Sequence, residues 1–297
     1  MSNQINKILE VDSVSKSVNG LTILSDISFT SYNSEVLTII GENGSGKTTL
    51  LGILLDDFKP TNGSVSYFPD KKKYFNDLGV VYDNQVIYPF LKVKELIKYF
   101  CAVRKVDYTL IEPKIELFSL SNIADRMIKN LSAGEKQKLS ILLSKIHNPK
   151  FLIYDEPFSS IDPLIRAEIW NAVNTENTSV ILTTHNWEFA EEISDRIILL
   201  HKGKMLSPAS STKKIYNKLP SKKKVVINND LFFNNNFNKL KTLKFYTHKD
   251  SVHIFNVDDS FLQELSKVTY NFSVLDVQLK DVYYYLLTYE NTQNTMD

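Results

Sequence analysis

Cysteine is almost absent from the 297-residue chain, which contains only Cys101. A single cysteine cannot form an internal disulfide, so we expect a reducing compartment and no thiol-ligated metal site. An excess of charge of one sign is also lacking, because 35 Lys and Arg residues face 34 Asp and Glu residues and leave a net charge of +1. This balance does not favour a nucleic-acid-binding protein.

Long apolar segments are missing as well. No stretch approaches the roughly 20 apolar residues that a membrane-spanning helix needs. The first residues, Met1–Gln4, have neither the basic nor the apolar region of a signal peptide. We therefore expect a cytoplasmic protein that works at a membrane only through another chain.

Glycine is scarce and unevenly placed. The 9 glycines make up about 3% of the chain, against a usual value of about 7%. All of them lie at or before Gly203, and neither glycine nor proline follows Pro220. This change in composition predicts an N-terminal domain, residues 1–206, that carries the chemistry, and a small C-terminal accessory domain, residues 207–297.

Short apolar runs alternate with helical patterns in the first of these domains. We predict buried strands at 36–40, 151–154, 179–183 and 196–200, and helices at 48–55, 136–146 and 164–173. This alternation indicates an α/β fold with a parallel sheet and with ligands at the carboxyl ends of its strands. The segment at about 88–146 has helical patterns without a clear strand, so we expect a helical subdomain inserted into the sheet.

The C-terminal part has the patterns of a small α+β unit. We predict strands at 223–227, 252–257 and 270–275, and helices at 260–268 and 279–289.

The segment Gly41–Thr48 fits the pattern G-x-x-x-x-G-K-[ST], between an expected strand and an expected helix. Phosphate oxygens are costly to dehydrate unless donors replace the water, and glycines let backbone N–H groups turn toward them at a helix start. Lys47 then bridges the β- and γ-phosphates, and the Thr48 hydroxyl binds Mg²⁺. We predict a nucleotide triphosphate site formed by Gly41, Asn43, Gly44, Ser45, Gly46, Lys47, Thr48 and Thr49. The alternative is a glycine-rich turn with an incidental lysine.

Two carboxylates, Asp155 and Glu156, follow the expected strand 151–154 directly. Asp155 is placed to hold Mg²⁺, and Glu156 can face an attacking water instead, as its general base or as the group that orients it. Acids after a strand are also common as solvated turn residues, and the nearby phosphate loop is what favours the catalytic interpretation.

The segment Leu131–Gln137, Leu-Ser-Ala-Gly-Glu-Lys-Gln, resembles the LSGGQ signature of ABC ATPases, with Ala133 where that pattern prefers glycine. Ser132 and Glu135 also have the spacing of a helix capping box, and both roles can coexist. Three further motifs follow in the order of that family, namely Asp155-Glu156-Pro157, Ser159–Asp162 and Thr184-His185. Residues 5–206 therefore resemble an ABC-type nucleotide-binding domain.

The resemblance implies a P-loop NTPase fold, Mg²⁺ and ATP, and a head-to-tail dimer of identical or different chains. Each ATP would lie between Lys47 of one subunit and Ser132 and Gly134 of the other, and His185 would contact the γ-phosphate. A structural histidine is the alternative for His185. Asp162 would communicate across the dimer, or it simply caps the helix that begins at the following proline.

The resemblance also implies a partner and a place in the cell. The partner is an integral-membrane permease, which would hold the protein at the inner face of the cell membrane. The segment Leu279–Tyr283 resembles the closing segment of single-cassette exporter ATPases, which favours export. Two other hypotheses stay open: a soluble ABC ATPase that acts on nucleic acid or ribosomes, and a regulatory module that binds ATP without transport.

Two positions depart from the family pattern. Val18 stands where an aromatic residue usually stacks on adenine, so we expect ATP binding dominated by the phosphates. At the glutamine loop, Asp83 takes the usual glutamine position and Gln85 lies two residues later. Asp83 could coordinate Mg²⁺ or water, or a shifted loop could instead bring Gln85 toward the nucleotide, and we prefer Asp83 slightly.

Overall fold

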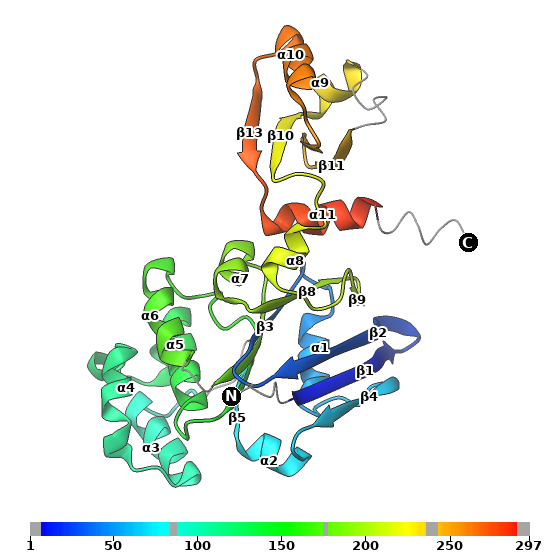
Figure 1. The fold of residues 1–297 in the computed structure, drawn as a ribbon. Coiled ribbons are helices and arrows are strands. Elements are labelled where there is room, and N and C mark those ends of the chain that lie inside the picture. The colour runs from blue at the N-terminus through cyan, green and yellow to red at the C-terminus, as the bar shows by residue number, and fades with distance from the viewer. Residues whose placement is uncertain (1–6, 84–87, 175–177, 236–242, 290–297) are drawn as a thin grey trace, which may run out of the picture. The chain divides into compact units, whose positions relative to one another are not determined.

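The chain divides into two units, residues 1–209 and 210–297 (Figure 1). The structure is a computed structural model that describes residues 7–83, 88–174, 178–235 and 243–289. Each unit is built around a sheet and is described by itself.

A six-stranded, mainly parallel sheet forms the centre of the first unit. Its order is β5-β6-β7-β3-β8-β9, in which only β9 is antiparallel to its neighbour. The strands are β3 Val36–Ile40, β5 Leu78–Val81, β6 Phe151–Tyr154, β7 Ser179–Thr184, β8 Arg196–His201 and β9 Lys204–Met205. The four predicted strands are confirmed, and every residue of β3 is buried, as expected for a strand covered on both faces.

Two layers cover this sheet (Figure 1). On one face lie α1 (Lys47–Leu54) and an antiparallel sheet of order β2-β1-β4. On the other face lie α5 (Ala133–Ser144), α6 (Pro163–Val173) and α7 (Trp187–Ile193). Side chains alternate between the faces, so that Leu152 packs with the second layer and Ile153 with the first.

The antiparallel sheet was not among the predicted elements. It consists of β1 Lys7–Val18, β2 Leu21–Tyr32 and β4 Asn62–Tyr67, and α2 Lys71–Asn76 follows it. Asn19 and Gly20 join the first two strands, both with positive φ angles, of 50° and 81°. An Asn-Gly pair with this backbone is a strong signal for a tight hairpin, and it could have identified β1 and β2 from the sequence.

The expected helical insertion is present. It contains α3 (Val93–Arg104), α4 (Glu112–Leu117), three short 3₁₀ turns and α5. Within residues 88–146, the only β-pairing is an isolated bridge between Lys92 and Met127. Cys101 is buried in this subdomain, in the apolar face of α3.

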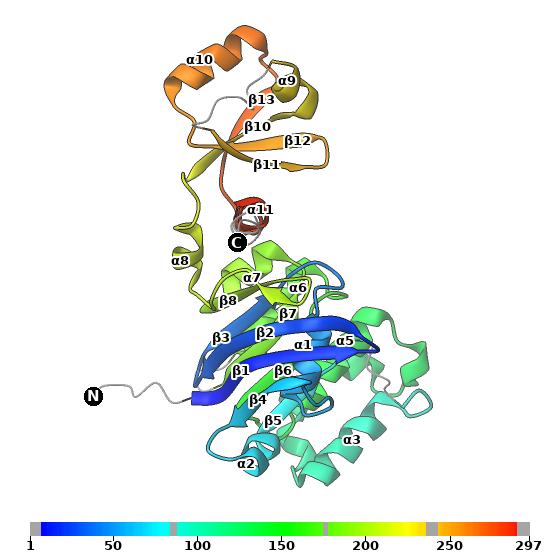
Figure 2. The same ribbon diagram turned by 90° about the vertical axis from the view of Figure 1, so that its right-hand side faces the viewer.

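The second unit is a four-stranded antiparallel sheet of order β11-β12-β10-β13 with helices on both faces (Figure 2). The strands are β10 Lys223–Asn228, β11 Lys244–His248, β12 Ser251–Phe255 and β13 Phe272–Asp276. The helices are α8 Thr212–Tyr216, α9 Asn229–Asn234, α10 Asp259–Val268 and α11 Leu279–Tyr289. The predicted α+β character is confirmed, and β11 is the strand that the sequence patterns did not indicate.

A membrane-spanning segment is not found in the part of the chain that the structure describes, because none of its helices combines the necessary length with sufficient apolar character.

Candidate functional site

The Gly41–Lys47 loop joins the carboxyl end of β3 to the first turn of α1. Gly44 and Gly46 have φ angles of 79° and 104°, a region that side-chain-bearing residues rarely adopt. A Cβ atom on Gly41 would lie 2.2 Å from the Leu200 carbonyl oxygen, so this position has no room for a side chain. The loop therefore needs glycine at three positions in order to curl over the helix start.

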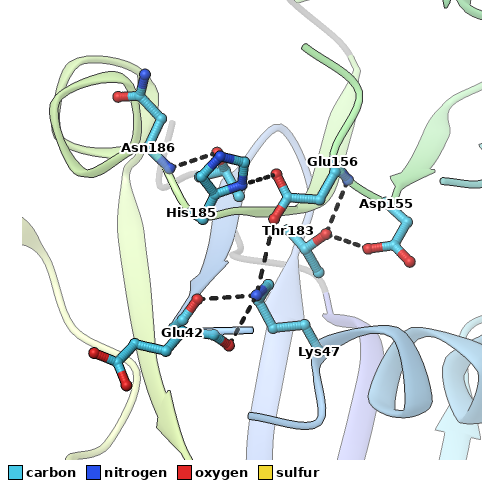
Figure 3. Close-up of polar contacts among 9 residues, drawn as sticks. Glu42, Lys47, Asp155, Glu156, Thr183, His185 and Asn186 are labelled. Atoms are coloured by element: carbon cyan, nitrogen blue, oxygen red, sulfur yellow. Dashed lines mark hydrogen bonds and ion pairs between the residues drawn. The ribbon is translucent and has the colours of Figure 1, made fainter. Parts of the chain in front are cut away.

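Lys47 is buried beneath this loop, with 7% of its surface exposed. Its ammonium group donates to the carbonyl oxygens of Gly41 at 2.9 Å and Glu42 at 3.2 Å (Figure 3). It also lies 3.8 Å from Oε1 of Glu156. The Lys47 ammonium group is thus held inside the loop by weak neutral acceptors, which the oxygens of a nucleotide can replace.

The loop has the donors that a triphosphate needs. The Ser45 hydroxyl is buried and has no hydrogen-bond partner among the described residues, so a ligand oxygen would satisfy it. The side chain of Thr48 is exposed at the first turn of α1. Thr49 follows it at the same helix start and is half-buried.

Asp155 and Glu156 follow β6 and are both fixed by one hydroxyl, that of Thr183 in β7. The Glu156 backbone N–H donates to Thr183 Oγ1 at 3.0 Å, and the same hydroxyl donates to Asp155 Oδ1 (Figure 3). Thr183 is fully buried and Asp155 is 3% exposed. One buried hydroxyl therefore holds the main chain of Glu156 and the carboxylate of Asp155, a role for Thr183 that no local pattern in the sequence indicated.

Glu156 lies between two partners. One carboxylate oxygen faces Lys47, and the other accepts a hydrogen bond from Nδ1 of His185 at 2.9 Å. The Glu156 backbone has a φ angle of 46°, which is unusual for a non-glycine residue and is held by the Thr183 contact. The geometry brings together the three residues that the sequence analysis identified as catalytic, Lys47, Glu156 and His185.

His185 comes directly after β7, at the start of the turn that leads into α7. Its side chain is 59% exposed, so a ligand can reach the imidazole. The next residue, Asn186, is fixed on both sides, because its N–H donates to the Thr184 hydroxyl and its side chain caps α7. The exposed imidazole is therefore attached to a well-fixed turn.

The oxygen donors Thr48 and Asp155 suit Mg²⁺, which prefers hard oxygen ligands and keeps several waters. Among the described residues no cluster of three His, Cys, Asp or Glu side chains is placed to hold a metal ion, so these residues by themselves form no closed metal site. Such a set fits an ion that arrives with phosphate oxygens as its other ligands. Mg²⁺ bound there would neutralise charge that develops on the transferring phosphoryl group.

Asp83 is exposed in the turn after β5. Its strand ends beside the acidic pair, because the Asp155 N–H donates to the Val81 carbonyl oxygen at 2.8 Å. This places Asp83 at the same edge of the sheet as Asp155, and its role as a metal ligand stays a prediction. Gln85 lies outside the described residues.

Ser132 and Gly134 form a separate group at the start of α5. The capping box is confirmed: the Glu135 N–H donates to Ser132 Oγ at 3.2 Å, and the Ser132 N–H donates to Glu135 Oε2 at 2.7 Å. A Cβ atom on Gly134 would lie 2.8 Å from the Ser160 carbonyl oxygen. No hydrogen bond found in the described part of the chain joins Ser132 or Gly134 to the Gly41–Thr48 loop.

Asp162 has the capping role that its neighbour Pro163 suggested, because its side chain accepts from the Leu164 N–H at 2.8 Å. Its part in any communication between subunits stays a prediction.

A parallel sheet, a glycine loop at a helix start and a strand that ends in two acids define a P-loop nucleoside triphosphatase. The fold and the arrangement around Lys47 place the chain in this class.

Comparison with known proteins shows to which family of P-loop nucleoside triphosphatases the chain belongs. The ABC transporter family matches residues 24–159. An uncharacterized ABC transporter ATP-binding protein of Bacillus subtilis, YdbJ, is 30% identical over 213 residues, which cover 68% of this chain and 69% of that protein. The spermidine/putrescine import ATP-binding protein PotA of Haemophilus influenzae is 31% identical over 227 residues, which cover 71% of this chain and 60% of PotA.

The fold comparison agrees. A solved structure of an ATP-binding subunit of an ABC transporter superposes with a TM-score of 0.65, at 23% identity, and covers 71% of this chain and 92% of that one. The chain belongs to the ABC transporter ATP-binding proteins, and it is an ATPase of that family.

Proposed function

We propose that this chain is the ATP-hydrolysing subunit of an exporter and powers a separate integral-membrane permease from the inner face of the cell membrane. The observation that carries the proposal is the position of the Glu156 carboxylate, between Lys47 in the phosphate loop and His185 after β7. Export is supported only by the likeness of Leu279–Tyr283 to exporter ATPases. The relative PotA is named as an import protein, so direction needs its own test.

The chemistry follows from what each group can do. Phosphate oxygens are stronger acceptors than the backbone carbonyls of Gly41 and Glu42, so binding of ATP draws the Lys47 ammonium group to the phosphates. One Glu156 oxygen then becomes free to accept from a water molecule. With its other oxygen still bound to His185, the carboxylate can hold that water for in-line attack on the γ-phosphate.

We infer that the pocket is completed by a second subunit, of the same or a different chain. Ser132 is exposed, and its contacts stay within its own helix start. The N-terminus of α5, where Ser132 and Gly134 lie, suits the close approach of a phosphate group. In a head-to-tail dimer, each γ-phosphate would lie between Lys47 of one subunit and Ser132 of the other.

The chemical part of the proposal is tested by comparing ATP hydrolysis in the wild type and in Glu156→Gln. Loss of a general base or of the group that orients the water should lower kcat by about 10²–10⁴-fold while ATP still binds. Glu168→Gln, an exposed position on α6, is the matched control and should keep the wild-type rate. Equal rates for all three proteins would remove Glu156 from catalysis.

The transport part needs the partner. We expect a hydrophobic, multi-span chain to be recovered with the tagged protein from detergent-solubilised membranes. ATP-dependent uptake by inside-out vesicles would then indicate export, and uptake by right-side-out vesicles with ATP enclosed would indicate import. Recovery with ribosomes and without a membrane chain would contradict the permease and favour a soluble ATPase.

A further inference from the structure

The strand β13 lies at one edge of the sheet of the second unit (Figure 1). It pairs with β10 on one side, and no neighbour on its other side occurs among the described residues. Four of its five residues, Ser273–Asp276, are exposed. A strand of this kind presents a row of free N–H and C=O groups.

The hydrogen-bond pattern shows which groups are free. The Val277 N–H donates to the Lys222 carbonyl oxygen, so Val277 faces β10. In an antiparallel ladder the direction alternates along the strand, so Ser273 and Leu275 also face β10. The backbone groups of Phe272, Val274 and Asp276 therefore point away from the sheet.

The opposite edge of the same sheet is closed. There, the Tyr289 hydroxyl accepts from the Phe245 N–H at 2.9 Å and donates to the Phe245 carbonyl oxygen at 3.0 Å. A side chain from α11 thus satisfies the outward backbone groups of Phe245 in β11. Nothing comparable covers β13 in the described chain.

The surroundings of β13 are apolar on both faces. Val274 is 48% exposed on the face that α9 and α10 cover, and Leu275 is 47% exposed on the other face. Tyr270, just before the strand, is 90% exposed. The lysines, prolines and bulges that commonly protect edge strands are absent from Phe272–Asp276.

We propose that β13 pairs antiparallel with β13 of a second copy of this chain, with Val274 on the two-fold axis. The outward groups are symmetric about Val274, so Phe272 of one copy meets Asp276 of the other and about six main-chain hydrogen bonds form. The two Asp276 carboxylates lie roughly 14 Å apart, beyond the screening length at physiological salt, so they do not oppose the contact. Val274 and Leu275 add apolar contact on the two faces.

A second copy is the occupant that the strand itself supports. When two β13 strands pair about a two-fold axis, Phe272, Val274 and Asp276 of each copy all find hydrogen-bond partners in a single register. This contact joins two copies and leaves no β13 edge free for a third. The single charge, Asp276, has its own cross-strand partner in Lys223, so no uncompensated charge selects a basic or acidic peptide. The contact needs no nucleotide and involves none of the residues of the ATP site.

The direct test is disulfide crosslinking of the full chain in EDTA, without nucleotide. Opposed residues that exchange both hydrogen bonds have Cα atoms about 5.5 Å apart, which a disulfide can span. Val274→Cys should therefore give a covalent dimer under mild oxidation. Thr247→Cys, an exposed and outward position on the closed edge, is the matched control and should give about tenfold less. The native Cys101 is buried and adds little background.

A second pair of variants tests the hydrogen bonds. The Val274 N–H makes no bond within its own sheet, so Val274→Pro removes none and should fold normally by circular dichroism. It should lower the dimer association constant measured by sedimentation by about tenfold or more, whereas Thr247→Pro should not.

Equal crosslinking at both edges, no crosslinking at Val274, or unchanged association in Val274→Pro would each overturn the proposal. Because these measurements contain no ATP, they can fail while the Glu156→Gln test succeeds, and the reverse is also possible.

Discussion

The Thr183 hydroxyl is the contact whose removal tests the organisation of the site most sharply. Thr183→Val keeps the shape of the side chain and replaces only the hydroxyl by a methyl group. It leaves the Glu156 N–H and one Asp155 oxygen without their partner, in a place where Thr183 is fully buried.

The expected loss follows from the two bonds. A hydrogen bond to a charged group contributes about 1.5–3 kcal/mol and a neutral one about 1 kcal/mol. Burial of the new methyl group returns about 0.8 kcal/mol. The free energy of unfolding of the first unit should therefore fall by about 2–3 kcal/mol, which corresponds to about 4–12 °C in Tm for a unit of this size.

Activity should fall as well, because the Glu156 backbone is no longer held in its unusual conformation. A shift of the carboxylate by an ångström predicts a decrease in kcat of about 10–100-fold. Thermal unfolding and ATP hydrolysis are measured beside Thr183→Ser, which keeps the hydroxyl and should lose about 1 kcal/mol for its missing methyl group. If the valine variant matches the serine variant in both assays, the hydroxyl does not position the acids.

Two further predictions concern other parts of the chain. Val18→Tyr should strengthen ATP binding by about ten- to a hundredfold, because an aromatic ring adds base stacking of about 1–3 kcal/mol; unchanged affinity in calorimetry would show that the base is held otherwise. In the second unit, burial lowers the pKa of His253 from 6.5 to about 4, with a further contribution from Lys224. Because the pKa of His253 is lower in the folded state, the unfolded chain binds a proton between pH 6.5 and 4 that the folded chain does not bind. The free energy of unfolding is therefore highest above pH 6.5 and should fall by about 2 kcal/mol, after allowance for solvent screening, as the pH decreases toward 4. The free energy of unfolding, measured by chemical denaturation at several pH values, should depend less on pH in His253→Phe than in the wild type. An equal pH dependence in the two proteins would contradict the lowered pKa of His253.

Local patterns predicted the parts of the site that are contiguous in sequence. The Gly41–Thr48 loop and the strand ending in Asp155 and Glu156 each carry their own signal, since glycine spacing and apolar runs fix the backbone locally. Thr183 had no such signal. Its contact with Asp155 spans 28 residues and exists only because β6 and β7 are neighbours in the sheet.

The same distinction holds for the accessory unit. Its helix α11 was predicted at its observed bounds, because a helical apolar stripe is a local property. That Tyr289 closes the β11 edge could not be predicted, because its hydroxyl meets Phe245 across 44 residues of chain. The β1–β2 hairpin was missed for a different reason: its Asn19-Gly20 turn is a local signal, but only the neighbouring Val18 entered the predictions, as a position near the adenine base.

The central claim is that each ATP is held between two chains, and complementation tests it most directly. Lys47→Ala and Ser132→Arg should each abolish ATP hydrolysis, because every pocket of either dimer contains one defect. Co-expressed with different tags, the two variants should form mixed dimers with one intact pocket and recover up to about a quarter of the wild-type rate, since half of the randomly assembled dimers are mixed. Recovery no greater than the sum of the two inactive variants would show that Lys47 and Ser132 do not act across two copies of this chain.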